Sequence, residues 1–247
     1  MRRVAILGGT RGMGRSMARK FVERGDWVAL LGRDLEELAR SKSDLEARGA
    51  PGVRVVIAQC DLENTESFRP ALEGAEQALE GLDTVVVTAA VFATQEKLEA
   101  DPVLAHKMLT VDFANTIVFC EEVRKKLLLH SKGTLCVFSS VAGDRARKPV
   151  VLYGAAKAGL SAYLEGLDHR FRSQGLTTIC VKPGFVKTAM TAGLPTPPFA
   201  GDPDEVAQTV IQAIDAGTPV VYAPGIWRAV MTAIKAMPRF VMRRAKF

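Results

Sequence analysis

Cysteine and histidine are scarce in this chain of 247 residues, which has four of the former and three of the latter. The cysteines show no CxxC spacing and lie in apolar runs, so we interpret them as buried, reduced thiols of a cytoplasmic protein. His106, His130 and His169 form no metal-ligand pattern. The sequence therefore predicts no resident metal.

Long uncharged apolar runs, linkers and internal repeats are also missing. No run approaches the ~20 apolar residues that cross a bilayer, and residues 1–3 lead directly into a strand-like segment without a signal peptide. With 48% hydrophobic residues, the length suits one well-buried domain. We expect this domain to cover residues 1–225 and a helical segment to cover residues 226–247.

Acidic residues are absent after Asp215, although the chain contains 27 of them. Residues 226–247 hold six basic residues and no acid, so they account for the net charge of +6. Pro238 should kink or divide this segment. Apolar side chains at helical spacing predict one shared face and a set that flanks it. The face comprises Ile226, Val230, Ile234, Met237 and Val241, and the flanking set comprises Trp227, Met231 and Phe240.

Two interpretations of this basic amphipathic segment remain open. It favours peripheral contact with a membrane surface, which would place the protein at the inner face of the membrane. It is equally typical of a helix that packs on its own domain or on a second subunit, with its charges solvated. Nucleic acid is not an expected partner, because no recognised DNA- or RNA-binding module is present.

Short apolar runs alternate with segments of helical periodicity along the chain. The runs are residues 4–7, 28–31, 53–58, 84–87, 134–138, 177–181 and 220–222. This alternation favours a parallel sheet with helices on both faces. We therefore predict the α/β class: a single doubly wound Rossmann-type domain with a mostly or wholly parallel sheet of about seven strands.

A glycine-rich turn with GxxxGxG spacing follows the first run and contains Gly8, Gly12 and Gly14. Glycines allow the backbone to approach a phosphate at a helix N-terminus, where free N–H groups favour anions. The same stretch, residues 9–16, also fits GxxxxGRS. A P-loop NTPase is disfavoured, because Arg15 stands where the phosphate-gripping lysine belongs.

Tyr153 and Lys157 lie one helical turn apart in a helical run, so their side chains share a face. A lysine beside a tyrosine favours the phenolate and lowers the pKa of the tyrosine, as proton exchange near neutral pH requires. Ser140 follows the run 134–138, at the strand end where open α/β sheets bind ligands.

Together these three elements resemble the short-chain dehydrogenase/reductase family over residues 4–188. The resemblance implies an NAD(P)-dependent oxidoreductase acting on CH–OH or C=O groups, with Ser140, Tyr153 and Lys157 as catalytic residues. It also implies a homodimer or homotetramer. The cofactor contacts that it implies are Gly8, Thr10, Arg11, Gly12, Met13, Gly14, Asp61, Leu62, Ala89, Tyr153, Lys157, Pro183, Gly184, Val186 and Thr188.

Two positions depart from the family pattern. The family's NNAG segment is replaced by residues 87–90, which keep small side chains but lose the asparagine amide. The asparagine of the catalytic tetrad falls on Asp112, which we retain as a catalytic candidate. Asp112 can accept the same hydrogen bonds, and Asn115 on the same helix face is an alternative.

The end of the second strand predicts the cofactor. An acidic residue there would bind the ribose hydroxyls of NAD and repel a 2′-phosphate. The position is Gly32, followed by Arg33, and Arg11 lies in the glycine turn. Two guanidinium groups suit a phosphate, so we expect NADP(H) to be preferred over NAD(H).

The substrate prediction rests on the basic loop 144–149 and on a looser resemblance over the last hundred residues. That resemblance is to reductases acting on decaprenylphosphoryl-2-keto-erythro-pentofuranose, and it implies a lipid-linked phospho-sugar ketone. The loop is also explained as a solvated surface. Alternatives are a 3-oxoacyl, 3-ketosphinganine or general carbonyl reductase acting on a small molecule. A non-catalytic NADP-sensing protein is disfavoured, because Ser140, Tyr153 and Lys157 are all retained.

Overall fold

Parallel strands form a seven-stranded sheet at the centre of the computed structural model, which describes residues 1–130 and 132–245. Their order across the sheet is β3-β2-β1-β4-β5-β6-β7. The strands are β1 (Arg3–Leu7), β2 (Trp27–Gly32), β3 (Val55–Gln59), β4 (Thr84–Val87), β5 (Gly133–Phe138), β6 (Leu176–Pro183) and β7 (Val220–Ala223). The order reverses between β1 and β4, which creates a ligand crevice at the carboxyl ends of the strands. The predicted fold class is confirmed.

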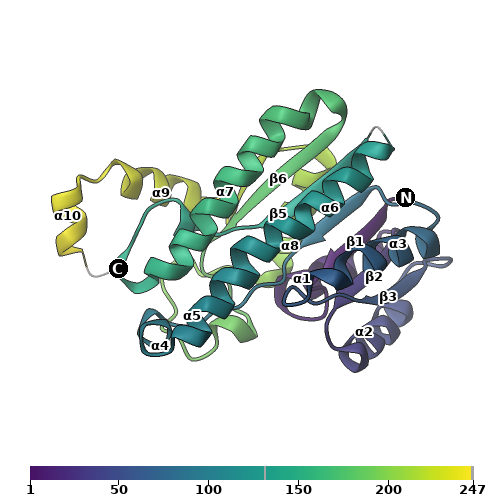
Figure 1. Ribbon diagram of the computed structural model, residues 1–247, viewed down its shortest axis with the longest axis horizontal. Helices are drawn as coiled ribbons and strands as arrows, with labels where there is room; N and C mark the ends of the chain where they lie inside the picture. The colour runs from purple at the N-terminus through teal and green to yellow at the C-terminus, as the bar shows by residue number, and fades with distance from the viewer. Residues whose placement is uncertain (131, 246–247) are drawn as a thin grey trace.

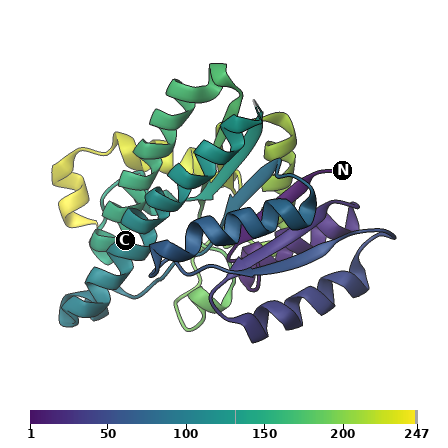
Figure 2. The same ribbon diagram turned by 45° about the vertical axis from the view of Figure 1, so that its right-hand side comes forward.

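Helices connect the strands and cover both faces of the sheet. They are α1 (Gly12–Glu23), α2 (Leu35–Arg48), α3 (Phe68–Leu79), α4 (Gln95–Ala100), α5 (Pro102–Leu109), α6 (Thr116–Leu129), α7 (Val151–Phe171), α8 (Pro203–Ala216), α9 (Ile226–Ala236) and α10 (Arg239–Arg244). Helices α3, α6 and α7 cover one face and α1, α2 and α8 the other (Figures 1 and 2). Because both faces are covered, the strands read as continuous apolar runs.

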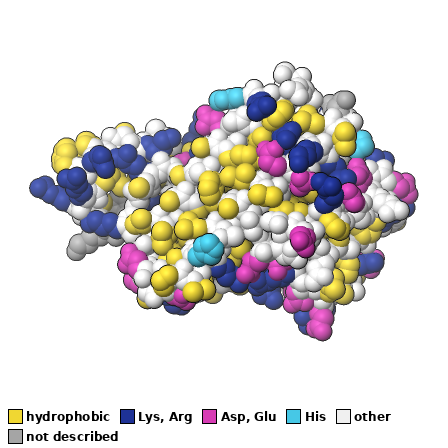
Figure 3. Space-filling view, in the orientation of Figure 1, with side chains coloured by type: hydrophobic (Ala, Val, Ile, Leu, Met, Phe, Trp, Pro, Cys, Tyr) yellow, Lys and Arg dark blue, Asp and Glu magenta, His cyan; other side chains and the backbone are white. Residues whose placement is uncertain are grey.

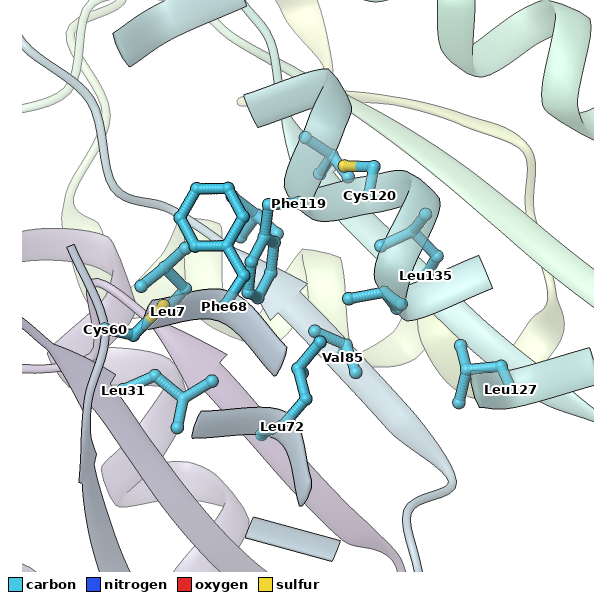
Figure 4. Close-up of a cluster of buried hydrophobic side chains, with 14 of the residues drawn as sticks. Leu7, Leu31, Cys60, Phe68, Leu72, Val85, Phe119, Cys120, Leu127 and Leu135 are labelled. Atoms are coloured by element: carbon cyan, nitrogen blue, oxygen red, sulfur yellow. The ribbon is translucent and has the colours of Figure 1, made fainter. Parts of the chain in front are cut away.

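Buried aromatic and aliphatic side chains join the helices to the sheet. The rings of Phe68 on α3 and Phe119 on α6 meet edge to face, with centroids 5.3 Å apart, above Leu7 and Leu31 of the strands (Figure 4). The cysteines are free and buried, as predicted: Cys60, Cys120, Cys136 and Cys180. This packing fixes the carboxyl ends of β1, β4 and β5 beside one another.

One continuous helical run, Pro102–Leu129, joins α5 to α6 through a π-helical segment, Thr110–Asn115. It is long and apolar enough to cross a membrane, although the sequence suggested no such segment, and a third of its most apolar window is buried. Phe119 and Val123 of this run are buried in the hydrophobic core between the helices and the sheet. We therefore interpret the run as a core helix whose outer face carries exposed Val118 and Leu129 beside the charged Glu122 and Lys125.

The C-terminal segment forms two short helices, and Pro238 divides them as expected. Helix α9 packs through Ile234 of the predicted face and through Trp227 and Met231 of the flanking set, whereas Ile226 is 46% exposed. The helical period was therefore right, and the buried face is shifted towards the flanking residues. Helix α10 projects away from the body (Figure 1). Of this segment, Lys246 and Phe247 lie outside the described residues.

Candidate active site

The glycine turn after β1 packs so closely that Gly8 and Gly14 cannot be replaced without displacing backbone. A Cβ at Gly8, which has a positive φ of 91°, would lie 2.6 Å from the Ala89 nitrogen. A Cβ at Gly14 would lie 2.3 Å from the Gly8 carbonyl oxygen. The Thr88 hydroxyl donates to that same oxygen at 3.0 Å. Thr88 thus holds the turn at the position where the family has an asparagine.

A cavity of about 520 Å³ opens beside this turn. The N-terminus of α1 has no side-chain cap, so its backbone N–H groups are available to an anion. Most of the predicted cofactor residues line the cavity: Gly8, Thr10, Arg11, Gly12, Met13, Gly14, Arg33, Asp61, Leu62, Ala89 and Thr188. The cavity and its donors fit a dinucleotide with its phosphates at the helix N-terminus.

Acidic side chains that the sequence analysis missed also line this cavity. Glu37 on α2 approaches Arg11 at 3.9 Å and Arg40 at 3.1 Å, and Glu63 lies 3.4 Å from Arg33. Both acids are thus compensated by guanidinium groups. The side chains of Arg11 and Arg33 remain 73% and 66% exposed, so a phosphate can reach them.

Ser140 lies in a tight turn directly after β5. Its hydroxyl oxygen accepts a hydrogen bond from the Ala142 nitrogen at 3.0 Å. A Cβ at Gly143 would lie 2.6 Å from the Lys157 carbonyl carbon, so the turn lies directly against α7. Ser139 is buried and donates to the Lys157 carbonyl at 2.9 Å. Ser139 therefore fixes α7, and Ser140 is the serine that faces Tyr153.

Tyr153 and Lys157 share one face of α7, with the Lys157 Nζ 5.6 Å from the centroid of the Tyr153 ring. The ring of Phe92 meets the Tyr153 ring edge to face at 5.2 Å. Phe92 lies in the loop after β4 and belongs to no motif, so its contact with Tyr153 could not be predicted from the sequence. These contacts fix the phenol beside the Ser140 turn.

Lys157 forms a buried ion pair with Asp112. The Lys157 Nζ lies 3.3 Å from one Asp112 carboxylate oxygen, and the other oxygen accepts from the Val91 nitrogen at 2.7 Å. The alternative residue Asn115 instead donates to the Leu62 carbonyl at 2.6 Å. Asn115 therefore orders the cofactor cavity wall and does not replace Asp112 beside Lys157.

Burial and charge act in opposite directions on the pKa values of this group. Burial raises the pKa of Tyr153 more than Lys157 lowers it, and the Asp112 carboxylate raises it further. The expected lowering by Lys157 is thus outweighed. Burial raises the pKa of Asp112, and Asp112 raises the pKa of Lys157 against the opposing effect of burial. Ion pairing favours a charged lysine and a neutral phenol.

The predicted contacts Pro183, at the end of β6, and Gly184 and Val186, after it, do not line the cavity, and neither do Tyr153 and Lys157. Gly184 is covered by Trp227 of α9, and a Cβ there would lie 2.1 Å from the indole nitrogen. That nitrogen donates to the Phe199 carbonyl at 3.1 Å. The C-terminal helix therefore supports this segment, a contact without a sequence motif.

The loop after the Ser140 turn is anchored by Asp144. Its carboxylate accepts from Lys182 at 2.5 Å and from the Tyr222 hydroxyl at 2.7 Å, which ties the loop to β6 and β7. The Asp144 carboxylate also raises the pKa of Arg147, although burial lowers that pKa by more. Among the described residues, no group of three His, Cys, Asp or Glu side chains is arranged to hold a metal ion.

Basic residues of this loop bind the C-terminal segment. Arg145 donates to the Met237 carbonyl at 3.0 Å, and Lys148 donates to the Arg243 carbonyl at 2.7 Å. The Nε of Arg147 is buried and has no hydrogen-bond partner within the described part of the chain. Burial lowers the pKa of Arg147. The expected solvated loop is thus partly a structural connection, and Arg147 retains a donor for an anion.

Comparison with known proteins gives a family match over most of the chain. The family model described as short chain dehydrogenase matches residues 2–197. An uncharacterized oxidoreductase of Mycobacterium tuberculosis is 30% identical over 241 residues, covering 98% of this chain and 96% of that protein. Carbonyl reductase family member 4 of Xenopus tropicalis is 25% identical over 215 residues, covering 84% and 88%.

Solved structures share the fold. An actinorhodin polyketide ketoreductase, solved with NADPH, superposes with a TM-score of 0.79 and 20% sequence identity. The match covers 90% of this chain and 95% of that one. At this identity the likeness supports the architecture alone.

Proposed function

This chain belongs to the short-chain dehydrogenase/reductase family and is an oxidoreductase with a nicotinamide cofactor, and from that premise we propose that it reduces a ketone with NADPH. The observation that carries this proposal is the convergence of Ser140, Tyr153 and Lys157, which Asp112 connects to Val91 in the wall of the glycine-lined cavity. A bound nicotinamide supplies hydride to the carbonyl carbon. The protein must then supply one proton to the carbonyl oxygen.

Tyr153 donates that proton, so its O–H bond breaks as the new alcohol O–H bond forms. Ser140 donates a hydrogen bond to the carbonyl oxygen and stabilises the charge that develops there. Lys157 would hold the ribose hydroxyls of the cofactor and keeps the phenol in place. The hydride and this proton together reduce the carbonyl to an alcohol, and solvent returns a proton to Tyr153.

Replacement of Tyr153 with Phe tests this assignment. Deleting a positioned general acid costs about 10²–10⁴-fold, so kcat for ketone reduction should fall by that factor while NADPH affinity changes little. Tyr163→Phe is the matched control, because Tyr163 lies on the same helix and donates to Glu121 instead. Turnover near that of the wild type in the Tyr153 variant would contradict the proposal.

We propose NADP(H) as the preferred cofactor because Arg11 and Arg33 face the adenosine end of the cavity with exposed guanidinium groups. Glu37 lies in the same cavity but is matched by Arg11 and Arg40. The 2′-phosphate of NADPH would meet two cations. NADH lacks this phosphate and therefore cannot form ionic contacts with the two guanidinium groups.

For the substrate we propose an anionic, lipid-linked ketone such as a phospho-sugar. The unpartnered Nε of Arg147 supplies a donor near the Ser140 turn, and an anion there would offset the cost of its burial. Arg147→Gln should raise KM for a polyprenyl-phosphate ketone and leave KM for a short neutral ketone unchanged. Equal loss on both substrates, or on neither, would favour a 3-oxoacyl or general carbonyl reductase.

Helix α10 is proposed to contact the inner face of an anionic membrane. Phe240 and Val241 are 63% and 36% exposed, and the projecting segment shows basic and apolar side chains side by side (Figure 3). Each such cation contributes about 1 kcal/mol near an anionic leaflet. Replacement of Arg239, Arg243 and Arg244 with Gln should abolish salt-sensitive sedimentation with anionic vesicles. Wild-type protein that never sediments would exclude membrane contact.

We also propose a homodimer or homotetramer. The outer face of the run Pro102–Leu129 exposes Val118 and Leu129, by 45% and 81%, beside the charged residues Glu122 and Lys125. A second copy would cover this face. Light scattering should give a mass of two or four chains, and a monomer at micromolar concentration would contradict the proposal.

A further inference from the structure

The Asp112–Lys157 pair is withdrawn from solvent on both sides. The Asp112 side chain is fully buried and the Lys157 side chain is 2% exposed. One carboxylate oxygen accepts from Val91, and the other lies 3.3 Å from the ammonium with no other partner among the described residues. Among the described residues, Lys157 is therefore the charged group that pairs with the Asp112 carboxylate.

An asparagine at position 112 could accept the same hydrogen bond from Val91, but it would carry no charge. A site with Tyr153, Lys157 and an asparagine has one uncompensated positive charge beside the phenol. With Asp112 the lysine charge is matched, and the net charge around the neutral phenol is zero. In a buried site with weak screening, this difference acts directly on the phenol.

We propose that Asp112, acting through Lys157, is a positioning residue that keeps Tyr153 protonated and thereby suits this site to donate a proton to a carbonyl rather than to take one from an alcohol. The inference rests on the proposed function for its chemistry. Reduction needs the phenol, whereas oxidation of an alcohol needs the phenolate as base. A matched lysine stabilises the phenolate less than an unmatched lysine does.

Few other charged groups face the phenol. Lys157 lies on the same helix, Asp112 on the π-helical segment, and the Ser140 hydroxyl favours the phenolate from the turn. From β6, Cys180 faces Lys157, but burial raises the pKa of this thiol and keeps it neutral. Asp112 is thus the acidic group that opposes Lys157 at Tyr153.

A titration of Tyr153 tests the inference without a substrate. The chain has three tyrosines, so ¹³Cζ-tyrosine labelling gives three signals, and Tyr153→Phe identifies the relevant one. In the NADP⁺ complex, Asp112→Asn should lower the midpoint of Tyr153 by about one pH unit or more. Asp26→Asn is the matched control, because Asp26 is equally buried and pairs with Arg24 away from the site. Its midpoint should equal that of the wild type.

Equal midpoints in wild type and Asp112→Asn would overturn the inference. If that variant fails to fold, Asp112→Ser removes the same charge and takes its place in the comparison, with the same expected shift, and a wild-type midpoint below the ordinary value of about 10 refutes the inference by itself. Kinetics give a second readout, because the alkaline limb of kcat/KM for ketone reduction should move with the tyrosine midpoint. Absence of any ketone reduction would instead refute the proposed function and leave the titration result intact.

Discussion

The cofactor preference gives the sharpest test, through Arg33→Ala. A charge-assisted hydrogen bond contributes about 1.5–3 kcal/mol. Because the Arg33 side chain is 66% exposed, solvent screens its contact with a phosphate, and the lower end of that range applies. Loss of about 1.5 kcal/mol weakens NADPH binding about tenfold. NADH lacks the 2′-phosphate, so its dissociation constant should stay within about twofold.

Fluorescence titration of both cofactors measures this difference directly. Arg69→Ala is the matched control, because Arg69 is 69% exposed, lies on α3, pairs with Glu122 and does not line the cavity. It should leave both dissociation constants unchanged. The reasoning fails if Arg33→Ala weakens NADH as much as NADPH, or if the wild type already binds NADH more tightly.

Three further outcomes follow from the packing and the charges. Gly14→Ala should abolish cofactor binding, measured by calorimetry, because the added Cβ would displace the backbone of Gly8. Met231→Ala removes a fully buried side chain of α9 and should lower the free energy of unfolding by about 2–5 kcal/mol in urea. Hydrogen bonding from Arg48 lowers the pKa of Asp44 to about 2. Asp44→Asn should therefore destabilise the protein at pH 7, and its difference from wild type should shrink as the pH falls from 4 towards 2.

The strands and the glycine turn were predictable because they depend on local sequence pattern. A parallel strand covered on both faces needs a continuous apolar run, and a close backbone approach needs glycine. The positions of Ser140, Tyr153 and Lys157 follow from the same strand–helix units. Their catalytic roles stay predictions until the variants are measured.

Tertiary contacts set the features that the sequence left open or placed wrongly. Periodicity identifies a helix at residues 226–236, but the packing of Trp227 against Gly184 determines which face of that helix is buried. Phe92 reaches Tyr153 from an irregular loop that no motif marks. The electrostatic balance at Tyr153 needed the burial of Asp112, which no spacing in the chain reveals.

The bonds from Arg145 and Lys148 to the C-terminal segment end on main-chain carbonyls. Such contacts constrain the path of the chain and place no demand on the side chains at positions 237 and 243. Substitutions at these two positions can therefore leave the loop bonded to the C-terminal segment, whereas Trp227 and Met231 of α9 must keep their packing.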